Sequence, residues 1–360
     1  MKLAKLFPIA AVVLFVAVAA APAFGQVRTE VPPVEANAKP VTADRIRIHG
    51  KALEGNLEGD AVDRDVIVYL PPSYATERNR RYPVLYALHG YSVGAEQWSK
   101  EIHVPQTIEG AFARGANEMI VVVPDSKTLH NGSMYSSSVT TGDFEQYIAH
   151  DVVAYVDAHY RTIPLRRSRG LVGHSMGGYG ATRIGMKHPD VFGTLYIMSP
   201  CCLSPRQALP LTPENAQALA SVTTTADAAK LPGTLRSLLA GAAAWSPNPK
   251  NPPLYLDLPF TGSDTVPRQD VLARWAANAP LAFADQYIGN LRQYNGISID
   301  VGDQDPLRID ASKLHDAFDR YGLVHTFEVY PGTHTSAMGV RFQNFVMPFF
   351  SRRLCTHECE

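Results

Sequence analysis

The chain has 360 residues, and its 33 Lys and Arg residues against 34 Asp and Glu residues give a formal net charge of −1. A hydrophobic content of 46% is enough for a folded core and excludes a disordered or collagen-like chain. The balanced charge argues against a dedicated nucleic-acid-binding protein, which would carry a basic excess. The length allows one large domain or two ordinary ones.

The first residues have the layout of a secretory signal peptide, expected to cover residues 1–25. Lys2 and Lys5 precede a long apolar run, and small residues occupy the −3 and −1 positions of a cleavage site. An uncleaved membrane anchor is the alternative, because the run approaches the length of a short span. We expect a secreted or periplasmic protein with no membrane span after signal cleavage. Residues 26–44, rich in Pro, Ala, Val and Glu, are expected to form a tether.

Short apolar segments then alternate with helical patterns. Strands are expected at 45–51, 65–70, 82–88, 119–123, 170–172, 193–198, 297–301 and 326–330, and helices at 144–160, 176–187, 269–277 and 311–321. Because several strands are apolar on both faces, this alternation predicts an α/β fold with a mostly parallel sheet. Residues 203–293, partly helical and partly Pro-rich, interrupt the pattern. We interpret them as a cap subdomain inserted into one domain at 45–354.

Four cysteines are candidates for disulfide bonds: Cys201, Cys202, Cys355 and Cys359, the last two in a C-terminal tail at 355–360. An even number of cysteines in an exported chain predicts disulfides, and four cysteines allow three pairings. A zinc site made of four thiolates is the alternative, but adjacent cysteines are poorly spaced for tetrahedral ligation.

A glycine-rich segment follows the strand expected near residue 172. Gly173-His174-Ser175-Met176-Gly177 matches the pattern G-x-S-x-G, in which a tight turn between a strand and a helix exposes a serine hydroxyl. The pattern alone is weak, and the apolar strand before it and the helical pattern after it give it weight. An ordinary Gly-rich turn is the alternative. We predict that Ser175 is a nucleophile.

A serine nucleophile needs a general base and an acid that orients the base. Asp300, Asp303 and Asp305 lie at the end of a predicted strand, and His334 follows the next strand. The order Ser, acid, His is the order of this fold class. We predict Asp305 as the acid because its loop position reaches farthest across the sheet, with Asp303 as the alternative; either could instead cap the following helix.

The tetrahedral intermediate of acyl transfer also needs hydrogen-bond donors for its negatively charged oxygen. One is expected to be the backbone N–H of Met176, which follows the nucleophile. The other is expected to be the backbone N–H of Tyr91, because Gly90 allows a close turn after the strand at 82–88.

Several segments together resemble one esterase family, which includes S-formylglutathione hydrolases, feruloyl esterases, enterochelin esterases and antigen 85 mycolyltransferases. The resemblance lies in Val66-Ile-Val-Tyr-Leu-Pro-Pro-Ser-Tyr74, Tyr82-Pro-Val-Leu-Tyr-Ala-Leu-His-Gly90 with Trp98, Gly173–Gly178, Asp300-x-Gly302-x-x-Asp305 and Gly332-Thr-His334. It implies an α/β-hydrolase fold and a metal-free, cofactor-free triad of Ser175, Asp305 and His334. The expected activity is hydrolysis of a carboxylic ester that is a small molecule or is linked to a polysaccharide.

Four further residues are candidates for lining the substrate site: His174, Tyr135, Trp98 and Trp245. For the two tryptophans, packing in the core is the alternative. Two other functions remain open at this point. The acyl group could pass to a sugar or another alcohol instead of water, or the chain could be a non-catalytic binding protein on a hydrolase scaffold.

Overall fold

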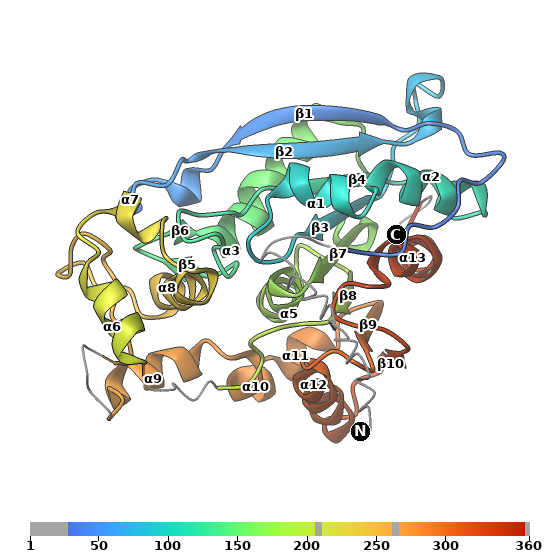
Figure 1. Ribbon diagram of the computed structural model, residues 1–360. Coiled ribbons are helices and arrows are strands. Elements are labelled where there is room, and N and C mark those ends of the chain that lie inside the picture. Colours follow the sequence, from blue (N-terminus) through green and yellow to red (C-terminus); the bar gives the residue numbers. More distant parts are fainter. Residues whose placement is uncertain (1–27, 206–210, 261–265, 357–360) are drawn as a thin grey trace, which may run out of the picture.

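The computed structural model describes residues 28–205, 211–260 and 266–356, which are built around one eight-stranded sheet (Figure 1). The strand order is β1-β2-β4-β3-β7-β8-β9-β10. The strands are β1 (Thr42–His49), β2 (Asp63–Leu70), β3 (Val84–Leu88), β4 (Ile120–Pro124), β7 (Arg169–His174), β8 (Thr194–Met198), β9 (Gly296–Gly302) and β10 (Thr326–Tyr330). β2 pairs antiparallel with β1 and β4, and the remaining neighbours are parallel, which confirms the mostly parallel sheet.

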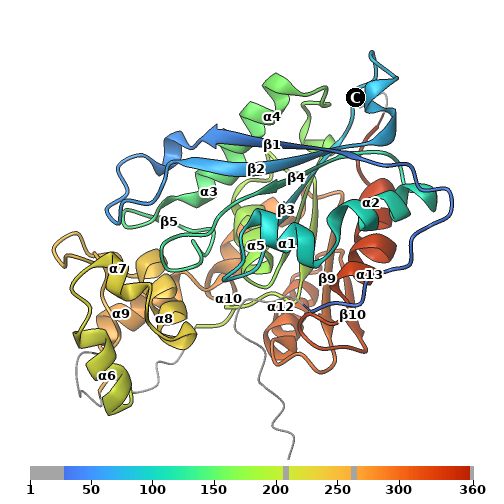
Figure 2. The same cartoon turned by 45° about the horizontal axis from the view of Figure 1, so that its top comes forward.

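Helices cover both faces of this sheet (Figures 1 and 2). They are α1 (Ala95–Glu101), α2 (Val104–Ala113), α3 (Phe144–Gln146), α4 (Val153–His159), α5 (Met176–Lys187), α6 (Pro213–Ala220), α7 (Thr225–Ala228), α8 (Gly233–Trp245), α9 (Gln269–Ala277), α10 (Pro280–Phe283), α11 (Ile288–Leu291), α12 (Arg308–Arg320), α13 (Met338–Arg341) and α14 (Met347–Ser351). A small hairpin, β5 (Ser137–Ser138) with β6 (Gly142–Asp143), lies outside the main sheet.

Successive side chains of a strand point to opposite faces of the sheet, and here both faces are buried. On β3, Val84, Tyr86 and Leu88 belong to one core cluster, and Leu85 and Ala87 belong to the other. The first cluster includes side chains of α4, α5, α8 and α12, and the second includes side chains of α1, α2 and α14. Two apolar layers therefore enclose the sheet, as the continuous apolar strands predicted.

Two segments differ from the sequence-based expectation. The helix expected at 144–160 consists of α3, a π-helical turn (Tyr147–Val152) and α4. The segment expected to be a tether is attached to the domain from Glu30 onward: its N–H donates to the Ser336 carbonyl at 2.6 Å, and Gln106 Nε2 donates to the Pro32 carbonyl at 2.6 Å. β1 begins at Thr42, inside the predicted tether, because this stretch can pair with β2.

The segment between β8 and β9 packs against the rest of the domain rather than standing apart from it. Ser138 Oγ donates to the Ala243 carbonyl at 2.5 Å, and Tyr179 OH donates to the Asn278 carbonyl at 2.7 Å. Leu239 of α8 and Val271 of α9 are fully buried in the same cluster as the sheet. The predicted insertion thus shares the core of the domain that it interrupts.

The predicted signal segment and Cys359 lie outside the described residues. Among residues 28–205, 211–260 and 266–356, no helix has the length and apolar character needed to cross a membrane. Of the cysteines within these ranges, Cys355 is disulfide-bonded, and the Sγ atoms of Cys201 and Cys202 lie 2.6 Å apart.

Candidate active site

Three predicted site residues come together at one edge of the sheet. Ser175 lies between β7 and α5, Asp305 between β9 and α12, and His334 between β10 and α13. Because β7 to β10 are parallel neighbours, their C-terminal ends meet at this edge. The strand order therefore brings together residues that are separated by 159 positions in the sequence.

The turn that carries Ser175 is strained and depends on its glycines. Ser175 has φ 58° and ψ −113°, a conformation that residues with a side chain rarely adopt. A Cβ on Gly173 would collide with the Gly177 carbonyl, and a Cβ on Gly177 would collide with the Leu88 carbonyl. The two glycines thus let the start of α5 approach β3 and β7, and the serine stands at the point of the turn.

Two hydrogen bonds link the three side chains. His334 Nε2 is 2.9 Å from Ser175 Oγ, and His334 Nδ1 is 2.7 Å from Asp305 Oδ2. Because an ionised carboxylate can only accept, Nδ1 of His334 carries the proton, and Nε2 is left to accept from the serine hydroxyl. The Asp305 side chain is fully buried, whereas that of His334 is 33% exposed. This arrangement can remove a proton from Ser175.

The two candidate acids make different contacts. Burial by itself would raise the pKa of Asp305, but the hydrogen bond from His334 and the N–H of Leu307, 2.9 Å from Asp305 Oδ1, hold the pKa below its usual value. Asp305 is therefore ionised at neutral pH. Asp303 instead accepts the N–H of Gly332 at 2.9 Å and so holds the turn that precedes His334.

His174 lies directly behind the catalytic histidine candidate. Its Nε2–H donates to the His334 carbonyl at 2.8 Å, and the two ring centroids are 4.6 Å apart. Burial lowers the pKa of His174 to about 3, and the neighbouring His334 ring adds to this effect. His174 is thus a neutral, buried residue that holds the backbone of His334, rather than a residue that lines the substrate site.

The two segments predicted to supply the oxyanion donors run beside Ser175. Met176 is the first residue of α5, so its N–H has no acceptor within the helix. The loop with Gly90 and Tyr91 runs next to Ser175: a Cβ built on Gly90 would lie only 3.5 Å from the Cβ of the serine. The Tyr91 side chain is held by its hydroxyl, which donates to the His130 carbonyl at 2.9 Å.

The three aromatic candidates for the substrate site are buried. Tyr135 is fully buried, and its hydroxyl donates to the His89 carbonyl at 3.1 Å. Trp98 is 1% exposed and lies edge-on to Phe342 in the second core cluster. It therefore packs in the core, which was the alternative to a place in the substrate site. Trp245 is 4% exposed and packs on other aromatic rings in the first cluster. All three side chains therefore lie in the interior of the domain.

A buried charged cluster near the site was missed by sequence reasoning. Arg341 Nη2 is 2.8 Å from Asp300 Oδ2 and 2.7 Å from Glu328 Oε2, and the Tyr196 hydroxyl donates to Asp300 at 2.8 Å. Burial raises the pKa of Asp300 to about 6 despite these partners. An aspartate inside an apolar strand was the signal in the sequence, because such a charge needs a buried partner.

Arg236 was also not singled out from the sequence. This residue of α8 donates to the Leu129 carbonyl at 3.0 Å and to Asn131 Oδ1 at 2.9 Å. The same loop holds the Tyr91 hydroxyl through His130. The insertion therefore braces the loop that supports one predicted oxyanion donor. Nothing in the sequence indicates this contact, because it depends on how α8 folds back onto the domain.

The parallel sheet, the strained turn after β7 and the Ser–His–Asp arrangement define the α/β-hydrolase class. Residues 61–344 match the family model described as "Putative esterase", and the chain belongs to this esterase family. A ferulic acid esterase structure has a TM-score of 0.62 at 22% identity, covering 88% of this chain and 99% of that chain.

Two curated relatives match over shorter stretches. An endo-1,4-beta-xylanase/feruloyl esterase of Xylanibacter ruminicola is 27% identical over 137 residues, 37% of this chain. An S-formylglutathione hydrolase of Paracoccus denitrificans is 26% identical over 149 residues, also 37% of this chain. These matches span 19% and 50% of the lengths of the two relatives.

Proposed function

We propose that the protein is an exported serine carboxylesterase that acts through an acyl-enzyme on Ser175. The observation that carries the proposal is the pair of hydrogen bonds from Asp305 through His334 to Ser175, at 2.7 and 2.9 Å. Membership of the esterase family supports ester hydrolysis as the reaction. Export is supported by the lysines and the apolar run at the N-terminus of the sequence.

The proposed reaction has two halves. Ser175 Oγ attacks the ester carbonyl carbon while His334 Nε2 takes the hydroxyl proton, and the carbonyl oxygen becomes an oxyanion that accepts from the N–H groups of Tyr91 and Met176. The C–O bond to the alcohol then breaks, and His334 returns the proton to the leaving alcohol. Water next attacks the acyl-enzyme with His334 as base, which releases the acid and restores Ser175. Asp305 stabilises the imidazolium in both halves.

The nucleophile is tested by labelling with a fluorophosphonate and by hydrolysis of short p-nitrophenyl esters. Wild type is expected to be labelled and active, and Ser175→Ala is expected to lose labelling and at least about 10³-fold in kcat. Ser199→Ala, at another buried serine that follows a strand, is the matched control and should still be labelled. Equal labelling of wild type and Ser175→Ala would show that another residue is the nucleophile.

The substrate class is tested with the compounds that the relatives' names suggest. We propose that the enzyme takes feruloyl-type carboxylic esters, because a feruloyl esterase and a ferulic acid esterase are among the similar proteins. The kcat/KM for methyl ferulate is expected to exceed that for S-formylglutathione. The opposite order would contradict the feruloyl proposal and leave the serine esterase mechanism intact. An acylated sugar, formed when a sugar acceptor is added, would instead indicate acyl transfer.

A further inference from the structure

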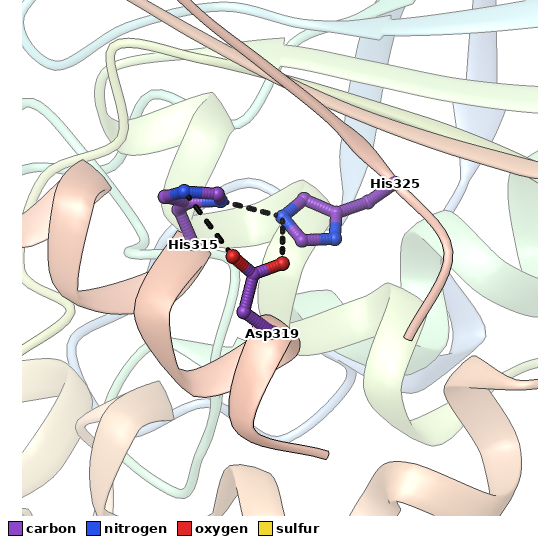
Figure 3. Close-up of side chains that lie close together, drawn as sticks. All are labelled: His315, Asp319 and His325. Carbon is purple, nitrogen blue, oxygen red and sulfur yellow. Dashed lines mark hydrogen bonds and ion pairs between the residues drawn. The ribbon is translucent and has the colours of Figure 1, made fainter. Parts of the chain in front are cut away.

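Three side chains with metal-binding atoms meet near the C-terminal end of α12. His315 and Asp319 are four residues apart on α12, so they share one face of the helix. His325 follows the turn after the helix and directly precedes β10. One ligand atom from each residue lies within 4.8 Å of the other two, and the three side chains point toward one another in Figure 3.

Both histidine rings are held in place by their surroundings. The His325 side chain is 3% exposed, and the Phe318 ring lies edge-on to it at 5.3 Å. His315 stacks on Phe327, with ring centroids 4.5 Å apart and an interplanar angle of 17°. A site whose ligands are already oriented loses little side-chain entropy when an ion binds.

The hydrogen bonds of His325 fix its tautomer and so show which ring nitrogen presents a lone pair to the cluster. His325 Nδ1 is 2.8 Å from the Leu323 carbonyl, so Nδ1 must carry a proton and donate. Nε2 of the neutral ring is then an acceptor, and it lies 2.9 Å from His315 Nδ1. A histidine that donates its other ring N–H to a backbone carbonyl is the usual arrangement around a bound metal ion.

The Asp319 carboxylate lies beside the hydrogen bond between the two rings. If His315 donates from Nδ1 to His325, its Nε2 lone pair faces Asp319 Oδ2 at 3.5 Å. Asp319 Oδ1 lies 4.0 Å from His325 Nε2. The His325 Nε2 lone pair accepts the proton of His315 Nδ1, so a metal ion would take the place of the hydrogen bond between the two rings and would be shared with the Asp319 carboxylate.

We propose that His315, Asp319 and His325 form a binding site for a divalent transition-metal ion of the zinc class. Ligands of a tetrahedral zinc ion at about 2.0–2.2 Å lie roughly 3.3–3.6 Å apart. One ligand atom from each of the three residues lies within 4.8 Å of the other two, so small side-chain movements would bring them to that spacing. Imidazole nitrogens favour Zn²⁺, Ni²⁺ and Cu²⁺ over Mg²⁺ and Ca²⁺. Water completes the coordination, because Asp319 is 62% exposed.

The ion would have a structural role, separate from the proposed ester chemistry. It would join the end of α12 to the start of β10, and these two elements border the loops of Asp305 and His334. The family resemblance predicts a metal-free triad, so this site would be an addition to the scaffold. The proposal does not depend on the proposed function, and a failure of either leaves the other unaffected.

The test is isothermal titration of the chelator-treated full chain, without a polyhistidine tag, with ZnCl₂. One zinc ion per chain is expected. His315→Ala and Asp319→Asn, at side chains that are 30% and 62% exposed and so leave the fold intact, should each weaken binding at least about tenfold. Saturating zinc should raise the Tm of wild type by about 5 °C and leave that of both variants unchanged.

Matched controls separate this site from other metal-binding groups. His159→Ala and Asp285→Asn change exposed residues elsewhere, and Cys201→Ser with Cys202→Ser removes the adjacent thiols; all should bind zinc as wild type does. Co²⁺ in wild type should show the visible absorption of a four-coordinate ion, and this band should be lost in His315→Ala. Absence of zinc binding in wild type, or equal binding in wild type, His315→Ala and Asp319→Asn, would overturn the proposal.

Discussion

Three side chains around His334 each fix a different part of this residue. Asp305 contacts the Nδ1 atom, Asp303 holds the turn through Gly332, and His174 holds the backbone carbonyl. Two aspartates in one loop thus have separate tasks, because the loop reverses direction between them. Of the two aspartates, Asp305 is the one that contacts the imidazole that would carry charge during the proposed reaction.

Replacement of each aspartate by asparagine separates these tasks. Asp305→Asn is expected to lower kcat on p-nitrophenyl esters by about 10²- to 10⁴-fold, because the amide no longer stabilises the imidazolium or the required tautomer. Asp303→Asn keeps the oxygen that accepts the Gly332 N–H and should stay within about threefold of wild type. A larger loss in Asp303→Asn than in Asp305→Asn would move the acid to Asp303.

A second residue-scale prediction concerns His174 and pH. Its pKa of about 3 lies below the ordinary value of 6.5, so between these values the unfolded chain binds a proton that the native protein does not. Its contribution to stability is therefore complete above pH 6.5 and is lost as the pH falls toward 3. Between pH 7 and pH 4.5 this loss amounts to about 2–3 kcal/mol.

Urea unfolding of wild type and His174→Gln at both pH values measures this contribution. Glutamine has no proton to gain, and its amide can still donate to the His334 carbonyl. The free energy of unfolding of wild type should fall by about 2–3 kcal/mol more than that of the variant. Equal falls in both proteins would mean that His174 is protonated in the native state.

At the scale of elements, the turn between β7 and α5 depends on close backbone contact. Gly177 lies against the Leu88 carbonyl at the end of β3, so its lack of a side chain sets how near α5 approaches the sheet. Gly289 of α11 is the opposite case, because a Cβ there would meet no atom within 4 Å. Replacement by alanine should therefore lower the free energy of unfolding at position 177 but not at position 289.

Gly177→Ala is expected to lower the free energy of unfolding by at least about 2 kcal/mol and to reduce activity, because the Leu88 carbonyl cannot move away without shifting β3. Gly289→Ala should be neutral or raise stability by about 0.5–1 kcal/mol, since it reduces the freedom of the unfolded chain. Chemical denaturation and ester hydrolysis measure both. A Gly177→Ala protein as stable as wild type would contradict the steric explanation.

At the scale of the whole molecule, a buried ion pair ties several elements together. Arg341 of α13 reaches Asp300 of β9 and Glu328 of β10, and the Tyr196 hydroxyl of β8 completes the contacts. Because Asp300 is fully buried and Glu328 is about half exposed, the two acids should differ in importance. Loss of Arg341 would leave the buried Asp300 carboxylate without a charged partner, whereas loss of Glu328 would leave Arg341 still paired with Asp300.

Arg341→Leu is expected to cost about 3–5 kcal/mol of unfolding free energy at pH 7. The cost should shrink at pH 5, because Asp300, whose pKa is already raised to about 6, becomes neutral without the arginine. Glu328→Gln should cost less than about 1 kcal/mol at either pH. Thermal or urea unfolding at the two pH values checks this, and a cost of Arg341→Leu that is unchanged at pH 5 would contradict it.

Sequence periodicity determined most of the architecture. The eight strands of the main sheet and α5, α9 and α12 lie within a few residues of their predicted ranges, because apolar patterning records which faces are buried. Ser175, Asp305 and His334 could be named in order, since each follows a strand and parallel strands end at one edge. The turn around Ser175 could be predicted from the sequence because the glycines that permit it lie within two residues of the serine.

Contacts between distant segments were decided only by the tertiary structure. The sequence left Trp98 open between the core and the substrate site. It could not pair Arg341 with Asp300 or bring Arg236 onto the loop at 129–131, because each contact depends on the direction in which separate elements pack. His325 meets His315 and Asp319 because the chain turns back after α12. Burial is a property that local patterns encode, whereas the partner of a buried charge is set by the strand order and by the packing of helices on the sheet.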